Sequence, residues 1–497
     1  MAKRKRDTPA DGPAAKAKKQ SPTTASTSTL QIITGSYERV LHGITASLDP
    51  GAIAAPAEDG SAVKWADTFL FNAHASAIRC LALSPPSDST DPHSQKVILA
   101  SGSTDERINL YHLSTAPPPI NAGPSIPTLT GTTITQNPRN KELGALMHHS
   151  SNVSALHFPS RAKLFSGADD NTVAISRTRD WTVLSTIKAP IPKAMGRPSG
   201  DTAAPGEVPA GINDFAVHPS QKLMISVSKG EKCMRLWNVM TGKKASVLNF
   251  ERDLLAAVGE GKFSSGEGRR LEWNPEGDEW VVTFERGFVV YGMDSKPKAQ
   301  TLPRPLTKIH QVHYVPSLGE GNDVLAVSTE DGRILFYSTQ ETVPAAKGDI
   351  PNCKLLAQLG GAAGGVLGRI KDFEILPIPS ESDSELATAF WIITGSSDGS
   401  VRLWKLSTAE LSADDDAKPA SKKKQKEKED GNAAAVPATA QAAKQVGALI
   451  GWYQTNNRIT CLKAFIMTGT PEDMSMAEAE EEDSAGSSSD DDDSDSE

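Results

Sequence analysis

The residue types that catalysis uses are present in this chain, but not in the spacings that catalysis requires. His148 and His149 are adjacent, so they would point to opposite sides of an extended strand, and no H-E-x-x-H motif is present. The glycine-rich segment Gly360–Gly365 lacks the Gly-Lys-Ser/Thr ending of a phosphate-binding loop. No Gly-x-Ser-x-Gly turn is present to expose a nucleophilic serine. The sequence therefore predicts a protein that is not an enzyme and that takes no cofactor and no metal.

The cysteines are spread along the chain without a C-x-x-C pair, which argues against a zinc site and against a disulfide framework. They are Cys80, Cys233, Cys353 and Cys461. Cys80 in IRCLAL and Cys461 in ITCLKA occupy matching positions of a repeat, where we expect a small core residue. This cysteine usage suits a reducing compartment.

Four aspartates recur at one position, six residues before the end of an apolar strand. The aspartates are Asp105, Asp170, Asp331 and Asp398, and the strands end at Tyr111, Ser176, Tyr337 and Trp404. A short carboxylate accepts the backbone N–H bonds of a tight turn. Because the four turns belong to different repeats, the carboxylates cannot pair as acid and base, and we interpret them as stabilisers of the turns.

These turns belong to a unit that recurs seven times: an apolar pair, small residues, a polar turn and a second apolar strand. The copies begin at Ile32, Leu99, Leu164, Met224, Trp280, Val324 and Trp391. A further short apolar strand precedes six of them, at 77–85, 153–160, 212–219, 270–277, 309–316 and 370–377. Units of this kind cannot bury their faces alone, so they must stack against one another.

The two ends of the chain hold complementary halves of one repeat. Ile32–Ile44 is a turn unit without a strand before it, and Arg458–Phe465 is a strand without a turn unit after it. Joined in one sheet, they would close a ring and remove its open seam. The predicted fold is all-β: a seven-bladed β-propeller closed by N- and C-terminal strands in one blade. The weak alternation of the strands fits sheets that pack on both faces.

The repeat resembles the WD-repeat β-propeller, whose blades pair a His, a Ser or Thr, a turn Asp and a Trp. The pattern is degenerate in this chain. His74, Ser101 and Asp105 belong to a blade that ends at Tyr111, and the blade that ends at Trp237 has a glutamate in its turn. The strand ends are spaced more widely than the roughly 40–45 residues of a plain blade. We therefore expect polar insertions on the rim.

The expected domain organisation has three parts. The N-terminal arm and the C-terminal tail, residues 1–29 and 468–497, are too polar to fold. The propeller occupies 30–467, and its main rim insertions are 114–141, 189–210, 340–366 and 407–446.

Several longer segments are similar to the maintenance-of-killer family of WD-repeat proteins, whose animal members are called PAK-interacting. They include GSYERVLHGI at the start of the propeller, Met147–His149, and the stretch Asp214–Ala245. The resemblance implies a factor of the nucleus and nucleolus that acts in rRNA processing and maturation of the large (60S) ribosomal subunit. The animal members are also implicated in restraining a PAK kinase.

The net charge of −9 hides opposite charges at the two ends of the chain. Residues 1–30 hold seven Lys or Arg and two Asp. Two basic clusters there are typical of a bipartite nuclear import signal: Lys3, Arg4, Lys5 and Arg6, then Lys16, Lys18 and Lys19. In a nucleolar protein the arm would also contact rRNA phosphates. The alternative is a solvated tail that no receptor binds.

The C-terminal tail is acidic and rich in serine. Residues 472–497 hold thirteen Asp or Glu and no basic residue. Ser488, Ser489 and Ser494 each have an acidic residue three positions on, as acidophilic kinases such as casein kinase two prefer, and phosphorylation would deepen the charge. Such tails compete with nucleic acid for basic proteins. The alternative is a tail that only solubilises the protein.

We therefore expect a non-enzymatic scaffold, a monomer within a larger complex, whose loops dock pre-ribosomal proteins. The absence of a run of ~18 apolar residues excludes a membrane-spanning helix, and the start MAKRKRDTPADG is not a secretory signal. Two alternatives stay open. One is a regulator that binds and inhibits a PAK-type kinase, and the other is a substrate receptor of a ubiquitin ligase, for which no docking motif is visible.

Overall fold

A computed structural model describes eleven segments of the chain. They are residues 28–48, 63–88, 95–118, 126–127, 133–192, 209–261, 264–319, 323–345, 350–378, 386–411 and 443–468. The basic arm, the acidic tail and most of the 189–210 and 407–446 insertions lie outside these segments.

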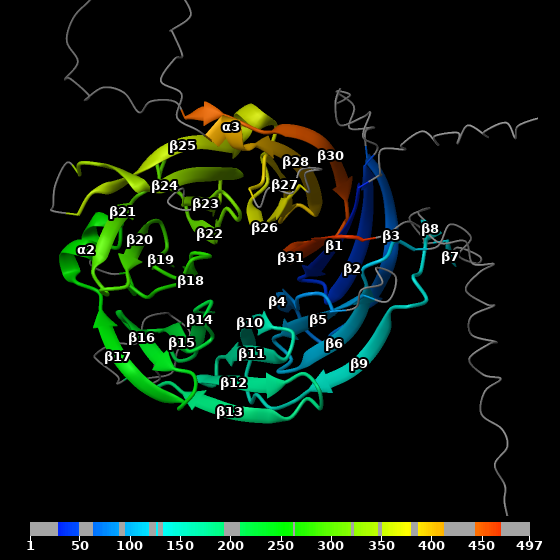
Figure 1. The fold of residues 1–497 in the computed structure, drawn as a ribbon, viewed down its shortest axis with the longest axis horizontal. Helices are drawn as coiled ribbons and strands as arrows, with labels where there is room; N and C mark the ends of the chain where they lie inside the picture. Colours follow the sequence, from blue (N-terminus) through cyan, green and yellow to red (C-terminus); the bar gives the residue numbers. More distant parts are fainter. Residues whose placement is uncertain are drawn as a thin grey trace, which may run out of the picture.

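The described strands form a ring of small antiparallel sheets around a central opening (Figure 1). The closing sheet has the order β31 (Ile459–Ile466), β1 (Ser28–Ser36), β2 (Val40–Leu48), β3 (Val63–Asn72), and the short strands β8 (Thr133–Ile134) and β7 (Ile126–Pro127) extend it. The next sheets along the ring are β4 (Ile78–Leu83), β5 (Lys96–Ser103), β6 (Ile108–Ser114), β9 (Lys141–Leu146); then β10 (Val153–Ser160), β11 (Lys163–Ala168), β12 (Thr172–Arg177), β13 (Val183–Lys188); then β14 (Ile212–Val217), β15 (Leu223–Ser228), β16 (Cys233–Asn238), β17 (Lys243–Asn249).

A nine-stranded sheet combines two groups of four, joined where β21 meets β25. The groups are β18 (Arg270–Trp273), β19 (Glu279–Thr283), β20 (Phe288–Gly292), β21 (Pro297–Thr301) and β22 (Ile309–Tyr314), β23 (Val324–Thr329), β24 (Arg333–Val343), β25 (Asn352–Gly360), with β29 (Lys444–Gln445) beside β25. The last sheet is β26 (Ile370–Pro377), β27 (Ala389–Ser396), β28 (Ser400–Ser407), β30 (Ala448–Gln454). The short helices are α2 (Arg252–Ala257), α3 (Thr408–Leu411) and the 3-10 turn η1 (Ala362–Gly364).

The predicted all-β propeller is confirmed, and so is the pairing of its two ends. β1 and β31 are antiparallel partners, with Ile32 opposite Ala464 and Ile33 opposite Lys463. Within the part of the chain that the structure describes, no helix is long and apolar enough to cross a membrane.

The middle strands are buried on both faces, which explains why their sequences alternate weakly. In β1, Ile32 packs into an apolar cluster shared with Ile393 of the last sheet. The next residue, Ile33, points the other way into a cluster with Ile78 and Leu99 of the following sheet. Because each neighbouring sheet supplies a hydrophobic face, the successive residues Ile32 and Ile33 are both apolar.

A second contact joins the closing sheet to the last sheet, between the outer strands β3 and β30. Tyr453 on β30 donates a hydrogen bond to Asp67 on β3 at 2.8 Å, and His42 Nε2 lies 2.7 Å from the same carboxylate oxygen. Asp67 is 3% exposed. A buried carboxylate is stable only with such partners, so this group ties the last sheet to the closing sheet.

The 340–366 segment differs from the expected rim loop, because it contains the outer strand β25. The sequence Asn352–Gly360 mixes polar and apolar residues, since one side of an outer strand faces solvent. Its buried members Ala357 and Leu359 complete the cluster between this sheet and the next. An outer strand therefore has a weaker sequence pattern than a middle strand. In the structure, β25 is identified by its antiparallel pairing with β24.

Deleting residues 459–497 should destabilise the whole ring, whereas deleting only 469–497 should not. The longer deletion removes the buried residues Ile459 and Leu462 and exposes the edge of β1. We expect the free energy of unfolding to fall by about 4 kcal/mol or more. Urea denaturation monitored by tryptophan fluorescence measures it. Coinciding unfolding curves for the two truncations would show that β31 does not close the ring.

Candidate functional site

The first predicted turn aspartate, Asp105, is part of a buried polar network. His74 lies before β4, and its Nδ1 is 3.1 Å from Asp105 Oδ2 while its Nε2 is 2.8 Å from Ser101 Oγ. Asp105 also accepts the backbone N–H groups of Ala75 and Arg107. Burial lowers the pKa of His74 even though Asp105 opposes the effect. The neutral imidazole therefore connects the turn between β5 and β6 to the loop before β4.

The expectation that His148 and His149 point apart is wrong. β9 ends at Leu146, so neither histidine lies on a strand. Both Nε2 atoms approach Ser166 Oγ, at 3.0 and 2.8 Å, and the ring centroids are 4.4 Å apart. His149 Nδ1 lies 3.1 Å from Asp170. The pair belongs to a second network of the His74 type.

Sequence reasoning missed this network, although a signal was present. His74 and His149 each stand four residues before an inner strand, and Ser101 and Ser166 each stand four residues before the turn aspartate. Burial, followed by repulsion from His149, lowers the pKa of His148 to about 4. Burial alone would raise the pKa of Asp170, but hydrogen bonds from His149 and Thr172 hold it well below its ordinary value.

The other two predicted aspartates accept hydrogen bonds from residues of their own turns. Asp331 accepts hydrogen bonds from Arg333 Nε at 2.7 Å and from the Thr329 hydroxyl. Asp398 accepts the backbone N–H of Ser400 at 2.9 Å and its hydroxyl at 2.6 Å. The four carboxylates lie in four separate sheet groups, so the structure does not bring them together.

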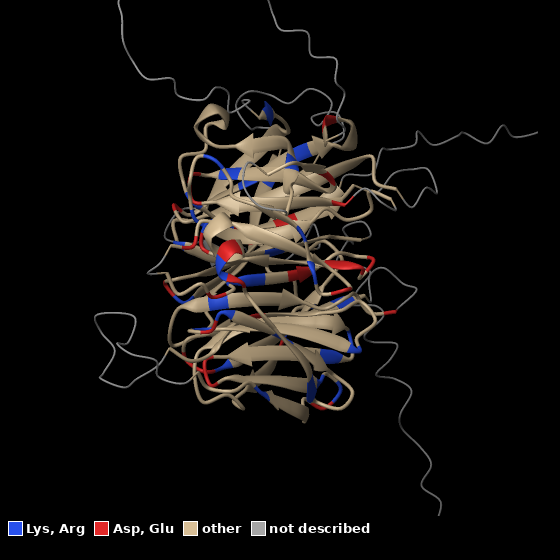
Figure 2. Ribbon diagram, turned by 90° about the vertical axis from the view of Figure 1, so that its left-hand side faces the viewer, with Lys and Arg blue, Asp and Glu red and all other residues tan. Residues whose placement is uncertain are grey.

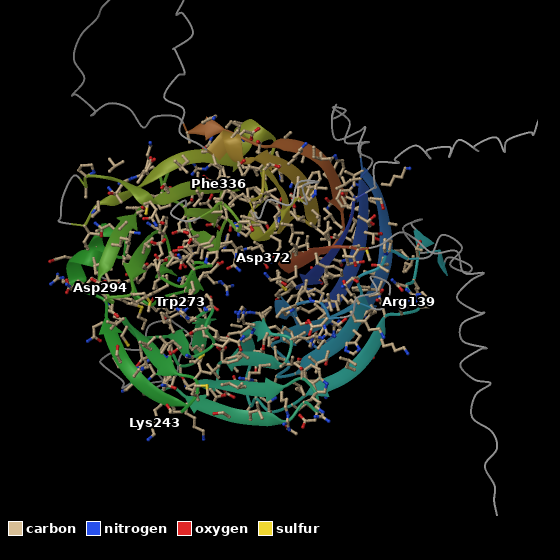
Figure 3. All side chains as sticks on the ribbon, in the orientation of Figure 1. Arg139, Lys243, Trp273, Asp294, Phe336 and Asp372 are labelled. Atoms are coloured by element: carbon tan, nitrogen blue, oxygen red, sulfur yellow. The ribbon has the colours of Figure 1, made fainter. Side chains whose placement is uncertain are left out.

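A central channel, rather than the turns, gathers polar groups from all the sheets. The cavity has a volume of about 780 Å³ and is lined by the inner strands. Asp372 and Trp273 border this opening, whereas Lys243 and Asp294 lie at the outer edge (Figure 3).

Carboxylates on the inner strands form hydrogen bonds that link neighbouring sheets along the channel wall. Each accepts a backbone N–H from the following inner strand. The bonds are Asp214 to Leu271 at 3.0 Å, Glu272 to Tyr314 at 3.3 Å, and Asp372 to Leu462 at 2.8 Å. Burial raises the pKa of Asp214 to about 6.

Deeper in the channel, charged groups are paired. Lys463 Nζ lies 2.7 Å from Glu374, and His313 Nδ1 lies 3.0 Å from Glu272. Burial opposes protonation of His313, but the neighbouring Glu272 carboxylate raises its pKa. These pairs neutralise the middle of the channel.

At one mouth of the channel the charges are less balanced. Arg79, Arg270 and Lys371 line the cavity from the first residues of β4, β18 and β26. His310 on β22 lies 3.4 Å from Lys371 Nζ. This mouth, with the loops that precede the inner strands, is the candidate binding site.

The histidines, cysteines and acidic residues of the described segments do not form a metal-ligand cluster. Among the described residues, no group of three or more His, Cys, Asp or Glu could hold a metal ion. The cysteines are free; Cys233, Cys353 and Cys461 are buried and Cys80 is half-buried. Burial raises the pKa of the Cys80 thiol to about 12, so it remains protonated and unreactive near neutral pH.

The suspected import and phosphorylation residues lie outside the described segments. They are Lys3, Arg4, Lys5, Arg6, Lys16, Lys18 and Lys19 in the arm, and Ser488, Ser489 and Ser494 in the tail.

Replacing Ser166 by alanine should destabilise the protein by about 1–3 kcal/mol, because it leaves the buried Nε2 of His149 without a partner. Ser150→Ala is the control beside His149, since Ser150 is exposed; its effect should stay within about 0.5 kcal/mol. Urea denaturation measures both. Equal unfolding midpoints would show that the serine is not part of a stabilising network.

Comparison with known proteins agrees with this architecture. The family described as "WD domain, G-beta repeat" matches residues 66–112, 140–175 and 386–405. Protein MAK11 of Saccharomyces cerevisiae is 27% identical over 76% of this chain and 78% of its own length. A p21-activated protein kinase-interacting protein 1-like protein of Danio rerio is 22% identical over 76% of this chain and 73% of its own, and one of Gallus gallus is 24% identical over the same shares. The chain therefore contains WD40 repeats within a propeller fold, and it is similar at low identity to MAK11 and to the p21-activated protein kinase-interacting proteins.

Proposed function

We propose that this protein is a docking scaffold that acts in maturation of the large ribosomal subunit in the nucleolus. The observation that carries the proposal is the similarity to MAK11 over 76% of the chain, together with the maintenance-of-killer resemblance of its sequence. A rigid ring supports it, because loops held at fixed angles by packed sheets can bind several partners at once. The partners are proteins of the large-subunit precursor.

The two ends of the chain have separate parts in this proposal. The basic arm brings the protein into the nucleus and contacts rRNA phosphates without sequence preference. The acidic tail shields basic ribosomal proteins, and phosphorylation of Ser488, Ser489 and Ser494 strengthens it.

A second candidate function is regulation of a kinase. It is favoured by the printed names of the relatives in Danio rerio and Gallus gallus, which describe interaction with p21-activated protein kinase. In that case the same loops bind the kinase and block its activation.

Sedimentation should separate the two functions. A factor of subunit maturation co-migrates with large-subunit precursors in a sucrose gradient, and its depletion lowers the amount of free large subunits. A kinase regulator stays in the light fractions and binds purified kinase directly. Recovery of the protein only in light fractions, with unchanged free subunits after depletion, would contradict the ribosomal proposal.

Deleting residues 1–20 should move the protein out of the nucleus, because both basic clusters are lost. The matched control replaces Ser21, Thr23 and Thr24 by alanine, which leaves every charge in place. Fluorescence microscopy of tagged proteins measures the nuclear fraction. If the deletion leaves localisation unchanged, the arm is not the import signal.

A further inference from the structure

The inner strands of six sheets share a β-bulge near the mouth of the channel. In β4 the register shifts between Ile78 and Cys80, and in β26 between Ile370 and Asp372, so Arg79 and Lys371 have no partner across the ladder. The same shift occurs at His310 in β22. A bulge turns its extra residue away from the regular sheet face. The bulge residues are Arg79, Ser154, Asn213, His310, Lys371 and Thr460.

This ring of bulge residues contains cations and neutral polar groups but no carboxylate. The strand β18 has no bulge and contributes Arg270 instead. Since the six bulges belong to strands far apart in the sequence, only the ring closure brings Arg79, Arg270 and Lys371 to one opening. The bulge is therefore a feature of the repeat, whereas the positive charge at the mouth comes from Arg79 and Lys371 in two of the bulges and from Arg270 on β18.

The cations at the mouth are poorly compensated. Within the described segments, no carboxylate forms an ion pair with Arg79 or Lys371, and the Arg270 guanidinium reaches Asp214 only at 3.9 Å. Burial, together with repulsion from Arg369 and Arg458, lowers the pKa of Lys371. An anion bound here would relieve this repulsion.

Two basic residues that precede inner strands but do not line the cavity have carboxylate partners. Lys308 lies 2.9 Å from Glu285, and Arg369 lies 3.2 Å from Glu330. On the side of the ring that carries α2 and β17, basic and acidic residues are interspersed (Figure 2).

Exposed apolar side chains stand on the loops around the same mouth. Met147 precedes β10, Leu306 precedes β22 and Leu367 precedes β26; they are 69%, 46% and 84% exposed. Tyr37, in the turn after β1, is also exposed, and its N–H donates to the Arg458 carbonyl at 2.9 Å. These side chains come from the loops of different sheets, and each is available to a bound protein segment.

The composition of this rim favours a protein ligand over RNA. Single-stranded RNA is held by several aromatic rings on which bases stack. The rim offers Tyr37, whose ring already has the Arg458 guanidinium carbon 5.5 Å from its centroid. Leu306, Leu367 and Met147 instead provide aliphatic contacts, which suit side chains of an extended peptide.

We propose that the mouth binds an acidic segment of a partner protein, with carboxylates at Arg79, Arg270 and Lys371 and apolar side chains on Leu306 and Leu367. The inference rests on the proposed docking function and specifies the chemistry of the partner. Deeper in the channel, Lys463 and His313 already have carboxylate partners. These two residues are therefore not available to bind the acidic segment.

The test uses the purified full chain and a fluorescein-labelled synthetic peptide in which Asp-Glu pairs alternate with single leucines. Fluorescence anisotropy should show that Arg79→Ala combined with Lys371→Ala weakens binding about tenfold or more. The matched control, Lys243→Ala with Lys244→Ala, removes two exposed charges from the outer strand β17 and should change affinity by less than about twofold. Equal losses in the two variants would overturn the proposal.

Further arms separate the competing ligands. Leu306→Ser with Leu367→Ser should also weaken peptide binding, whereas a peptide with glycine in place of leucine should be insensitive to this change. A single-stranded RNA that binds more tightly than the peptide, and loses binding in the Arg79 and Lys371 variant, would overturn the proposal in favour of nucleic acid. If deleting 469–497 raises the affinity for the peptide about tenfold, the chain's own acidic tail competes for the mouth. That result would replace the partner segment by the tail as the ligand. A negative result in these peptide-binding assays would not change co-sedimentation of the protein with large-subunit precursors. The proposed ligand and the proposed ribosomal function can therefore be disproved separately.

Discussion

The pairing of β1 with β31 is the constraint on which the rest of the structure depends. Each sheet of the ring needs a neighbour on both faces, and only a closed ring provides one for every sheet. Thr460 on β31 donates to the carbonyls of Gly35, on its partner strand, and Ile78, on the following sheet, at 3.0 and 2.7 Å. A Cβ at Gly35 would lie 2.7 Å from both Cys461 and Ile78. Glycine is therefore required where three strands from two sheets converge.

The same inner strands that hold the ring together also create its candidate site. The carboxylates of Asp214, Glu272 and Asp372 each accept a backbone N–H of the next sheet, which fixes their positions on the channel wall. The bulges beside two of them carry Asn213 and Lys371. A residue that joins two sheets and a bulge residue that lines the mouth are thus neighbours on one strand.

Different side-chain hydrogen-bond networks stabilise the repeat in different sheets. Two sheets connect a histidine, a serine and a turn aspartate. In a third, Trp237 Nε1 donates to Ser226 at 2.8 Å without a histidine, and Glu231 replaces the aspartate and pairs with Arg235. Because packing between sheets provides most of the stability, each polar network can be lost or replaced singly. This explains why the sequence pattern is degenerate while the architecture is regular.

The sequence by itself determined the strand repeat, the turn aspartates and the complementary ends, because each depends on local periodicity and turn chemistry. It did not reveal the outer strand β25, since a half-exposed strand has no strong pattern. It also did not reveal the shared role of His148 and His149, which depends on Ser166 of β11. The meeting of Arg79, Arg270 and Lys371 at one opening was decided only by the tertiary structure. These three residues are far apart in the sequence, so their spacing in the chain does not show that they are neighbours. They meet because the closed ring places the starts of all the inner strands around one axis.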